Sequence, residues 1–346
     1  MADTIRFGVV GAGNYTKNRQ LPNLLKIPGV EVVAVANRSL ESAQKVAATF
    51  NIPDATDDWR AVVQRDDIDA VLIGAPPYVH HDVANAAMAA GKDVLSQTRM
   101  SRTLEEARSM AATAQSTGRK AALVRPSRYV TAGSYVKQLL SSGFVGNVRQ
   151  VFCYRVIPDY TDSSAPITSR QDFDMYGELN CLYLGYCWDV LHDWFGEPRR
   201  VLAQALNFTP MRPSSPEGPL VEVRAAEAVT AIAEMESGAS VTSVQSGLVH
   251  FGTDRIEVYG DEGTLVYEAN SDRLMGGRRG DKELALMEVP DDQKDAWTVE
   301  RDFVRLVRGE IPQMFLTFED GVKNMAYLHA CHESALKGGW ANVASA

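Results

Sequence analysis

Three side chains that can hold or move a proton lie close together in the second half of the chain, at Tyr186, Asp189 and His192. Residues 177–195 predict a helix, and at about 3.6 residues per turn Tyr186 and Asp189 share a face, with His192 about 60° round from Asp189. These groups suit acid–base catalysis, and Asp189 with His192 would make a carboxylate–imidazole pair. In the alternative interpretation, Asp189 only caps or orients a neighbour and His192 is a hydrogen-bonded histidine between two domains.

A second chemical signal is a glycine turn near the N-terminus. The apolar run 5–10 leads into GAGNYT at 11–16 and then into helix-like sequence, which is the strand–turn–helix order of a dinucleotide fingerprint. Gly11 permits the tight turn, and Gly13 lets the backbone approach a pyrophosphate at the helix N-terminus. Thr16 replaces the third small residue, and an ordinary glycine turn is the alternative. The predicted cofactor contacts here are Gly11, Gly13, Asn14, Tyr15 and Thr16.

The residues that follow the next apolar run, Val30–Ala36, indicate whether NAD or NADP binds. An acidic residue is expected about 20 residues beyond the glycine turn, where it binds the 2′-hydroxyl of NAD. The chain instead has Asn37, Arg38 and Ser39 there. Asn37 carries no charge, and Arg38 could pair with the 2′-phosphate of NADP, stack on the adenine or point to solvent. We therefore expect NAD(P), with a slight preference for NADP.

Short apolar strands alternate with helices through the first 125 residues. This alternation predicts an α/β fold with a parallel sheet, in which ligands bind at the carboxyl ends of the strands. The segment APPYVHH follows one such strand, although His80 there could simply begin a helix after a rigid turn. Further predicted cofactor contacts at these strand ends are Ala75, Pro76, Pro77, His80, Gln97, Thr98 and Arg125.

The rest of the chain predicts a second domain, so we place a Rossmann domain at 1–125 and an α/β domain at 126–346. Its strand-like segments, separated by turn signals, predict a large, mainly antiparallel open sheet. We expect one face of this sheet to lie against helix 177–195 and the other to be available to a partner subunit. The strand-like segments are 201–208, 228–236, 240–249, 255–259 and 264–268; helices are expected at 294–308 and 318–336.

Composition narrows the class of protein. A net charge of -9 without a basic cluster argues against nucleic-acid or anionic-membrane partners. A strand starting within five residues of Met1 leaves no room for a signal peptide, and no apolar run approaches transmembrane length, so we expect a cytoplasmic protein. We expect free thiols and no metal, because HExxH and CxxC patterns are absent and the four cysteines are scattered: Cys153, Cys181, Cys187 and Cys331.

Seven motifs together resemble the glucose-fructose oxidoreductase, inositol dehydrogenase and rhizopine-catabolism family, Gfo/Idh/MocA. The resemblance implies a Rossmann domain, a C-terminal domain whose sheet supports homodimers or homotetramers, and NAD(P)-dependent oxidation or reduction of sugars, polyols and cyclic alcohols. The motifs are GAGNYT (11–16), ANRS (36–39), APPYVHH (75–81), AAGKDVLSQTRM (89–100), SSGFVGNVRQV (141–151), YCWDVLHDWFGEP (186–198) and TFEDGVKNM (317–325).

The chain departs from the family at both catalytic motifs. The family usually has Glu-Lys-Pro after AGKDVL, and its lysine assists proton transfer, whereas this chain has Gln97-Thr98-Arg99. The family's Asp and His on the second-domain helix align with Leu182 and Tyr186, or with Tyr183 and Cys187 in the neighbouring register. Some family members have tyrosine at the His position. The resemblance therefore makes Tyr186 the first candidate for proton transfer or substrate anchoring.

Arg99 occupies the position of the family's proline beside the reacting centre. A guanidinium there could bind a carboxylate, phosphate or sulfonate through two hydrogen bonds. Alternatively, Arg99 does not bind substrate but forms a salt bridge with Glu105 or Glu106 at the start of the next helix.

The other predicted substrate contacts are Arg128, Tyr154, Arg155 and Tyr160. Arg128 follows the last Rossmann strand, where family members contact the nicotinamide side and the substrate. Strand alternation puts Tyr154 and Arg155 on opposite faces, so at most one of them faces the site. Tyr160 lies in the loop that follows.

Three functions remain open. The first is an NAD(P)-dependent oxidoreductase acting on a sugar, polyol or cyclic diol or ketone, with Tyr186 or a water in place of the lysine. The second is a non-redox glycosidase or lyase that uses tightly bound NAD for transient oxidation. The third is a non-catalytic dinucleotide-binding sensor. Consumption of external cofactor, product release with unchanged bound cofactor, and binding without turnover distinguish them in that order.

Overall fold

The computed structural model describes residues 4–124, 131–177 and 183–344. The chain forms two compact units, Met1–Arg125 with Thr298–Met325, and Pro126–Trp297 with Ala326–Ser345. The division into a Rossmann domain at 1–125 and an α/β domain at 126–346, each with its own function, stays a prediction. In the described residues, no helix is both long enough and apolar enough to cross a membrane.

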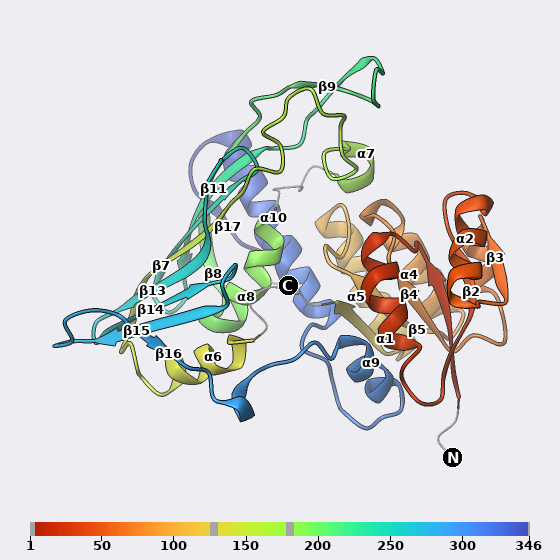
Figure 1. Ribbon diagram of the computed structural model, residues 1–346, viewed down its shortest axis with the longest axis horizontal. Coiled ribbons are helices and arrows are strands. Elements are labelled where there is room, and N and C mark those ends of the chain that lie inside the picture. Colours follow the sequence, from red (N-terminus) through yellow and green to blue (C-terminus); the bar gives the residue numbers. More distant parts are fainter. Residues whose placement is uncertain (1–3, 125–130, 178–182, 345–346) are drawn as a thin grey trace. The chain divides into compact units, whose positions relative to one another are not determined.

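The first unit contains a six-stranded parallel sheet in the order β3-β2-β1-β4-β5-β6 (Figure 1). This is the doubly wound order of dinucleotide-binding domains, in which the strand order reverses between β1 and β4. The predicted parallel Rossmann sheet is confirmed. The strands are β1 (Ile5–Val10), β2 (Val30–Ala36), β3 (Asp54–Thr56), β4 (Ala70–Ile73), β5 (Asp93–Gln97) and β6 (Ala121–Val124).

The helices of this unit begin where the sequence supplies caps. Ser39, Asp58 and Thr103 each accept a hydrogen bond from the first turn of the helix that follows. Helical structure after the glycine turn continues through η1, which has π-helical geometry, into α1. The helices are η1 (Thr16–Gln20), α1 (Leu21–Leu24), α2 (Leu40–Phe50), α3 (Trp59–Val63), η2 (Pro77–Val79), α4 (His80–Ala89), α5 (Leu104–Thr117) and α9 (Val299–Val307).

A late segment of the chain completes the first sheet. The backbone amide of Leu123 donates to the carbonyl of Leu316 at 3.0 Å, and Ala122 forms an antiparallel bridge with Thr317. The outer edge of β6 is therefore covered by Leu316 and Thr317, which lie almost 200 positions further along the chain.

The second unit contains a nine-stranded sheet in the order β16-β15-β14-β13-β7-β12-β11-β8-β17. Only β7 and β12 pair in parallel, with Val151 opposite Val241. The predicted mainly antiparallel sheet is confirmed. The strands are β7 (Val148–Val156), β8 (Pro198–Leu206), β11 (Ala228–Met235), β12 (Ser240–Ser246), β13 (Asp254–Gly260), β14 (Gly263–Glu268), β15 (Arg273–Arg278), β16 (Ala285–Met287) and β17 (Ala341–Asn342).

Helix α8 (Leu184–Phe195) lies against one face of this sheet (Figure 1). The thiol of Cys187 contacts the Gln245 side chain on β12 at 3.6 Å, and Trp188 stacks on Tyr327 of α10 (Phe318–Lys337) with ring centroids 3.5 Å apart. In the described residues α8 begins at Leu184, whereas the sequence predicted a helix from 177; Gly177, which follows α7 (Phe173–Tyr176), has a φ of 76°, outside the helical region. A partner subunit on the opposite face stays a prediction.

Three smaller elements complete the second unit. Strands β9 (Met211–Pro213) and β10 (Leu220–Glu222) form a separate antiparallel hairpin. Helix α6 (Gly133–Ser141) precedes β7, and η3 (Asp291–Gln293) precedes the return to the first unit.

Candidate functional site

The glycine turn has the backbone shape that a phosphate-binding loop requires. Gly11 has φ +83°, and a Cβ there would lie 2.3 Å from the amide nitrogen of Ala75. A Cβ on Gly13 would instead have only the carbonyl oxygen of Gly74 within reach, at 3.9 Å. Gly11 is therefore required by the fold, whereas Gly13 leaves room for another group. The helix that starts after Gly13 leaves N–H groups of its first turn without intrahelical acceptors.

Thr16 fits at the third fingerprint position because of a glycine on the neighbouring strand end. A Cβ on Gly74 would lie 2.1 Å from the hydroxyl oxygen of Thr16. The buried hydroxyl of Thr16 donates to Gln20 at 2.9 Å. The amide of Gln97 donates to Thr16 at 3.2 Å and to Gln20 at 2.7 Å. Thr16 and Gln97 thus form part of a network that ties the helix to β5.

Asn37 supports the glycine turn from the end of β2. Its side-chain oxygen accepts a hydrogen bond from the amide of Ala12 at 2.7 Å, and its nitrogen donates to Ser42 at 3.0 Å. Ser39 caps α2, while Arg38 is exposed. The three residues predicted to contact the ribose are Asn37, Arg38 and Ser39. In the described part of the chain, Arg38 is the one of these whose side chain makes no hydrogen bond or ion pair. Asn14 and Tyr15 are likewise exposed at the helix start.

His80 joins the loops that follow β4 and β5. Its ring nitrogens lie 2.6 Å from the carbonyl oxygen of Ala75 and 3.1 Å from that of Met100. Burial lowers the pKa of His80, although the two carbonyls act in the opposite direction. His80 is therefore a buried residue at the start of α4 whose ring connects two loops of the protein. This agrees with the alternative interpretation, in which His80 begins a helix after a rigid turn. Pro77 is buried beside it, and Ala75 and Pro76 are half-buried.

The second unit holds a cluster of tyrosines around one arginine. The hydroxyl of Tyr183 donates to the carboxylate of Asp159 and accepts a hydrogen bond from Arg170 at 3.0 Å. The guanidinium of Arg155 lies 4.2 Å from the ring centroid of Tyr183, and that of Arg170 lies 5.2 Å from it. Desolvation lowers the pKa of Arg170, but the four tyrosines Tyr186, Tyr183, Tyr176 and Tyr160 act in the opposite direction and raise this pKa overall.

Tyr154 and Arg155 lie on opposite faces of β7. Tyr154 stacks beside Phe152, with ring centroids 6.3 Å apart, on the face away from α8. Arg155 forms an ion pair with the fully buried carboxylate of Asp254 and reaches the Tyr183 ring. Of these two predicted contacts, Arg155 therefore belongs to the tyrosine cluster.

Tyr160 is fixed by a neighbouring glycine. A Cβ on Gly247 would lie 2.3 Å from the Tyr160 ring, and the amide of Tyr160 donates to the carbonyl of Gly247 at 2.7 Å. Burial raises the pKa of the Tyr160 hydroxyl, which keeps it protonated.

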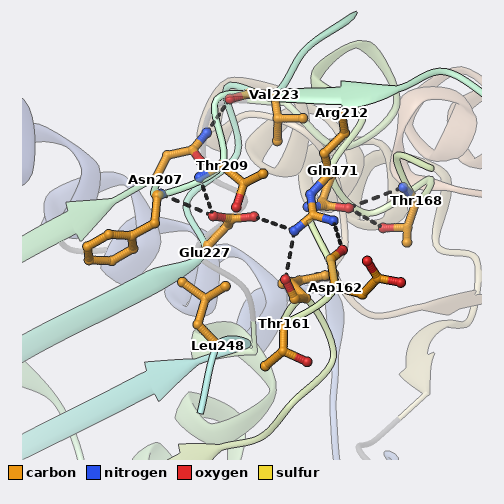
Figure 2. Close-up of polar contacts among 12 residues, drawn as sticks. Thr161, Asp162, Thr168, Gln171, Asn207, Thr209, Arg212, Val223, Glu227 and Leu248 are labelled. Atoms are coloured by element: carbon orange, nitrogen blue, oxygen red, sulfur yellow. Dashed lines mark hydrogen bonds and ion pairs between the residues drawn. The ribbon is translucent and has the colours of Figure 1, made fainter. Parts of the chain in front are cut away.

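A buried ion pair between Arg212 and Glu227 anchors the loop around Thr161 and Asp162 (Figure 2). The guanidinium of Arg212 donates to the carbonyls of Asp162 at 2.6 Å and Tyr160 at 2.7 Å, and to Glu227 at 3.0 Å. The other carboxylate oxygen of Glu227 accepts two backbone N–H bonds, from Phe208 and Thr209. The side chains of Arg212 and Glu227 are 1% and 0% exposed. This pair therefore fixes the loop to the β9–β10 hairpin and to β11.

On helix α8, Tyr186 is half-buried and Asp189 is buried. His192 does not pair with Asp189 as the spacing suggested. Its Nε2 lies 2.8 Å from the carboxylate of Glu197, just beyond the helix end at Gly196. Helical spacing alone cannot reveal this partner, because Glu197 lies outside the helix.

Two family models cover most of the chain. Residues 5–124 match the model described as "Oxidoreductase family, NAD-binding Rossmann fold", and residues 134–266 match the "GFO/IDH/MocA C-terminal domain". The chain belongs to the Gfo/Idh/MocA family. The resemblance inferred from its motifs is thereby confirmed.

Relatives within the Gfo/Idh/MocA family include sugar-modifying enzymes. The chain is 34% identical over 154 residues to dTDP-3,4-didehydro-2,6-dideoxy-alpha-D-glucose 3-reductase of Streptomyces antibioticus, which covers 44% of this chain and 47% of that protein. It is 29% identical over 139 residues to 4-carboxy-2-hydroxymuconate-6-semialdehyde dehydrogenase of a Sphingobium species, covering 40% and 44%. The chain thus spans about half the length of these curated relatives.

Solved Gfo/Idh/MocA structures share the whole fold. The structure titled levoglucosan dehydrogenase, complex with NADH and L-sorbose, superimposes with a TM-score of 0.85 at 21% identity, covering 99% of both chains. At this identity the comparison supports the fold of both units.

At the position of the Gfo/Idh/MocA lysine, the side chain of Thr98 is hydrogen-bonded within the protein. The hydroxyl of Thr98 donates to the carbonyl of Val124 at 3.1 Å, linking the ends of β5 and β6. Arg99 is half-buried, and Glu106, one of its two predicted salt-bridge partners, pairs with Arg102 at 2.9 Å. Arg125 and Arg128, also predicted as contacts, lie outside the described residues.

Sequence reasoning missed Asp159, Arg170 and the hydrogen-bonded role of Tyr183. Tyr183 appeared only in the alternative register of the second family motif. Asp159 and Arg170 lie in a loop without periodicity, so no spacing argument could bring them to the helix.

Proposed function

We propose that this Gfo/Idh/MocA protein is an NAD(P)-dependent oxidoreductase that transfers hydride between nicotinamide and a sugar, a polyol, or a cyclic diol or ketone. The observation that carries the proposal is the turn at Gly11–Gly13, closed on one side by Ala75 and open over Gly13. That shape suits a pyrophosphate at the helix start. The names of the relatives support a carbohydrate-like substrate.

The residues in this proposal have distinct tasks. The glycine turn, from Gly11 to Thr16, would hold the pyrophosphate, and the end of β2 would hold the adenosine ribose. The nicotinamide supplies the hydride chemistry when bound. The chain itself must orient the carbinol and move one proton, which we assign to Tyr186 on α8. Asp189 stays the second candidate, whereas the pairing of His192 with Glu197 favours a structural role for that histidine.

The test begins with protein purified without added nucleotide, from which any bound cofactor is released by denaturation and identified. Stripped protein is then titrated with NAD(H) and NADP(H). Reversible binding followed by turnover of carbonyl or carbinol compounds supports the proposal. Retention of oxidised NAD, with product release from a glycoside, would favour the non-redox glycosidase or lyase. Binding without turnover across a carbohydrate panel would favour the sensor, and no binding would overturn all three functions.

The preference for NADP rests on Arg38. The substitution Arg38→Ala is expected to raise the Kd for NADPH about tenfold and to change that for NADH less than about twofold, because a guanidinium–phosphate hydrogen bond contributes about 1.5–3 kcal/mol. Fluorescence titration of stripped protein with both reduced dinucleotides measures this. Arg60→Ala is the matched control, since Arg60 is also exposed and lies over the Trp59 ring at 4.4 Å. Equal weakening of both cofactors by Arg38→Ala would remove the basis for the NADP preference.

A further inference from the structure

The carboxyl end of β5 carries three residues that bear no negative charge, Gln97, Thr98 and Arg99. Gln97 is half-buried at the last position of the strand, where ligands of open parallel sheets bind. The Gfo/Idh/MocA family usually has glutamate at this position. The chain therefore has a neutral amide of nearly the same shape where a carboxylate is usual.

Gln97 lies on the nicotinamide side of the predicted dinucleotide site. In the sheet of the first unit, β2 lies on one side of β1, and β4 and β5 lie on the other. The residues predicted to contact the adenosine ribose follow β2, and the glycine turn that would hold the pyrophosphate follows β1. The other half of the dinucleotide would therefore extend over the ends of β4 and β5. All of these elements belong to the first unit.

Hydrogen bonds fix Gln97 against the helical segment that follows the glycine turn. Its side-chain nitrogen donates to the hydroxyl of Thr16 at 3.2 Å and to the side-chain oxygen of Gln20 at 2.7 Å, which uses both of its hydrogens. Thr16 donates to the same oxygen of Gln20 at 2.9 Å. The carbonyl oxygen of the Gln97 amide is the remaining polar atom, and its dipole stabilises a cation far less than a carboxylate does.

The loop after the neighbouring strand β4 adds no negative charge. Residues 74–80 contain neither Asp nor Glu. Burial lowers the pKa of His80, at the end of this loop, so that its ring is neutral near pH 7. Arg99, two residues beyond Gln97, adds a positive charge to the loop after β5. Residues 74–80 and 97–99 thus bring only neutral and positive groups to these two strand ends.

We propose that these strand ends make the protein bind the reduced dinucleotide in preference to the oxidised one, and that Gln97 determines this preference. The oxidised nicotinamide ring carries a positive charge, whereas the reduced ring carries none. A carboxylate at position 97 would stabilise the oxidised ring, whereas Gln97 offers it no opposite charge. The inference rests on the proposed function and deepens it, because it assigns the reductive direction and a carbonyl substrate.

The reductive step balances without a further reactant. The reduced dinucleotide gives a hydride to the carbonyl carbon of the substrate and becomes oxidised. The carbonyl oxygen takes one proton, which Tyr186 supplies in the proposed function, and the product is a carbinol. Water then returns a proton to Tyr186. A protein that binds the reduced form more tightly retains its hydride donor and releases the oxidised dinucleotide readily.

The test measures the Kd of stripped protein for NADH, NAD, NADPH and NADP, and for ADP-ribose, which lacks the nicotinamide ring. Wild-type protein should bind each reduced form about tenfold more tightly than its oxidised form, a difference of about 1.4 kcal/mol. Gln97→Glu should tighten the oxidised forms and remove most of this difference, because the carboxylate attracts the ring cation. The Kd for ADP-ribose should change less than about twofold, since the fragment has no such cation.

The fold has donors ready for a carboxylate at position 97. The hydroxyl of Thr16 already lies at hydrogen-bond distance from the Gln97 side chain. The side-chain nitrogen of Gln20 is buried and has no hydrogen-bond partner among the described residues. Rotation of the Gln20 amide by half a turn would direct this nitrogen towards the carboxylate. Gln97→Glu is therefore expected to fold and to differ from the wild type mainly in charge.

Two control variants separate charge from other effects. Gln97→Met removes the hydrogen bonds without adding a charge, so the ratio of the oxidised to the reduced Kd should stay within about twofold of the wild type. Gln115→Glu adds the same charge to an exposed position in the last turn of α5. Because α5 leads from the carboxyl end of β5 to the opposite edge of the sheet, this variant should also leave the ratio unchanged.

Three results would overturn the inference: equal affinity of the wild type for both redox forms, an unchanged ratio in Gln97→Glu, or the same change of ratio in Gln97→Met. Its failure is distinct from failure of the proposed function. Protein that binds ADP-ribose and both redox forms equally retains the dinucleotide site but has no reductive preference. Protein that binds none of these nucleotides has neither.

Discussion

Gly11→Ala is expected to weaken dinucleotide binding by about 100-fold, since displacing a positioned group by about 1 Å can have an effect of that size. The added Cβ would lie 2.3 Å from the nitrogen, 2.4 Å from the Cα and 2.5 Å from the Cβ of Ala75. Two backbone segments must separate to admit it, and those segments are the ends of β1 and β4. Left-handed φ and overpacking each cost about 1–3 kcal/mol, so the free energy of unfolding should fall by about 3 kcal/mol.

Gly91→Ala is the matched control for this substitution. Gly91 has a similar φ of +79°, but a Cβ there would have no atom within 4 Å. Its expected effect is therefore the conformational cost alone, about 1 kcal/mol, with cofactor affinity unchanged. Urea unfolding and nucleotide titration measure both quantities. Equal losses of stability in the two variants would show that contact with Ala75 is not what requires glycine at position 11.

Breaking the buried Arg212–Glu227 pair should have the second large effect. Arg212→Met leaves the carboxylate of Glu227 without its cation and the carbonyls of Tyr160 and Asp162 without their donor (Figure 2). Removing one member of a buried pair typically costs about 3–5 kcal/mol, and we expect a loss of that size in urea unfolding. Because the same loop carries Asp159 and Arg170, hydrogen exchange of the backbone around residues 157–172 should also accelerate.

An exposed pair from the same unit provides the comparison. Arg200 and Glu234 are joined by two hydrogen bonds, at 2.7 and 2.9 Å, yet their side chains are 45% and 41% exposed. Arg200→Met should leave the unfolding midpoint almost unchanged, because water screens and replaces such an interaction. A loss below about 1 kcal/mol for Arg212→Met would contradict the view that burial gives the Arg212–Glu227 pair its importance.

The parallel sheet of the first unit could be predicted because its strands are short apolar runs separated by helical periodicity. The glycine turn was equally visible, since left-handed backbone at Gly11 restricts the residue type. The fit of Thr16 was not visible, because it depends on Gly74, which approaches it only in the folded sheet. Local pattern reveals which element forms, whereas contacts between distant glycines and side chains require the three-dimensional arrangement.

The predicted site residues show the same division. Asn37 and His80 come at strand or helix ends, as expected, but their polar atoms contact backbone groups of the protein. Asn37 accepts a hydrogen bond from the amide of Ala12, and the ring nitrogens of His80 lie next to the carbonyls of Ala75 and Met100. Sequence position indicates that a polar side chain lies near a site. It does not indicate how many of its hydrogen bonds the protein itself already satisfies.

The closure of β6 by residues 316 and 317 has a consequence for how the protein is made. During translation, residues 1–124 leave the ribosome well before the segment that covers their outermost strand. Until Leu316 and Thr317 emerge, β6 presents an unpaired edge that can add a strand from another nascent chain. The first unit to be synthesised is therefore among the last to be completed, and a polypeptide interrupted before residue 316 would leave that edge open.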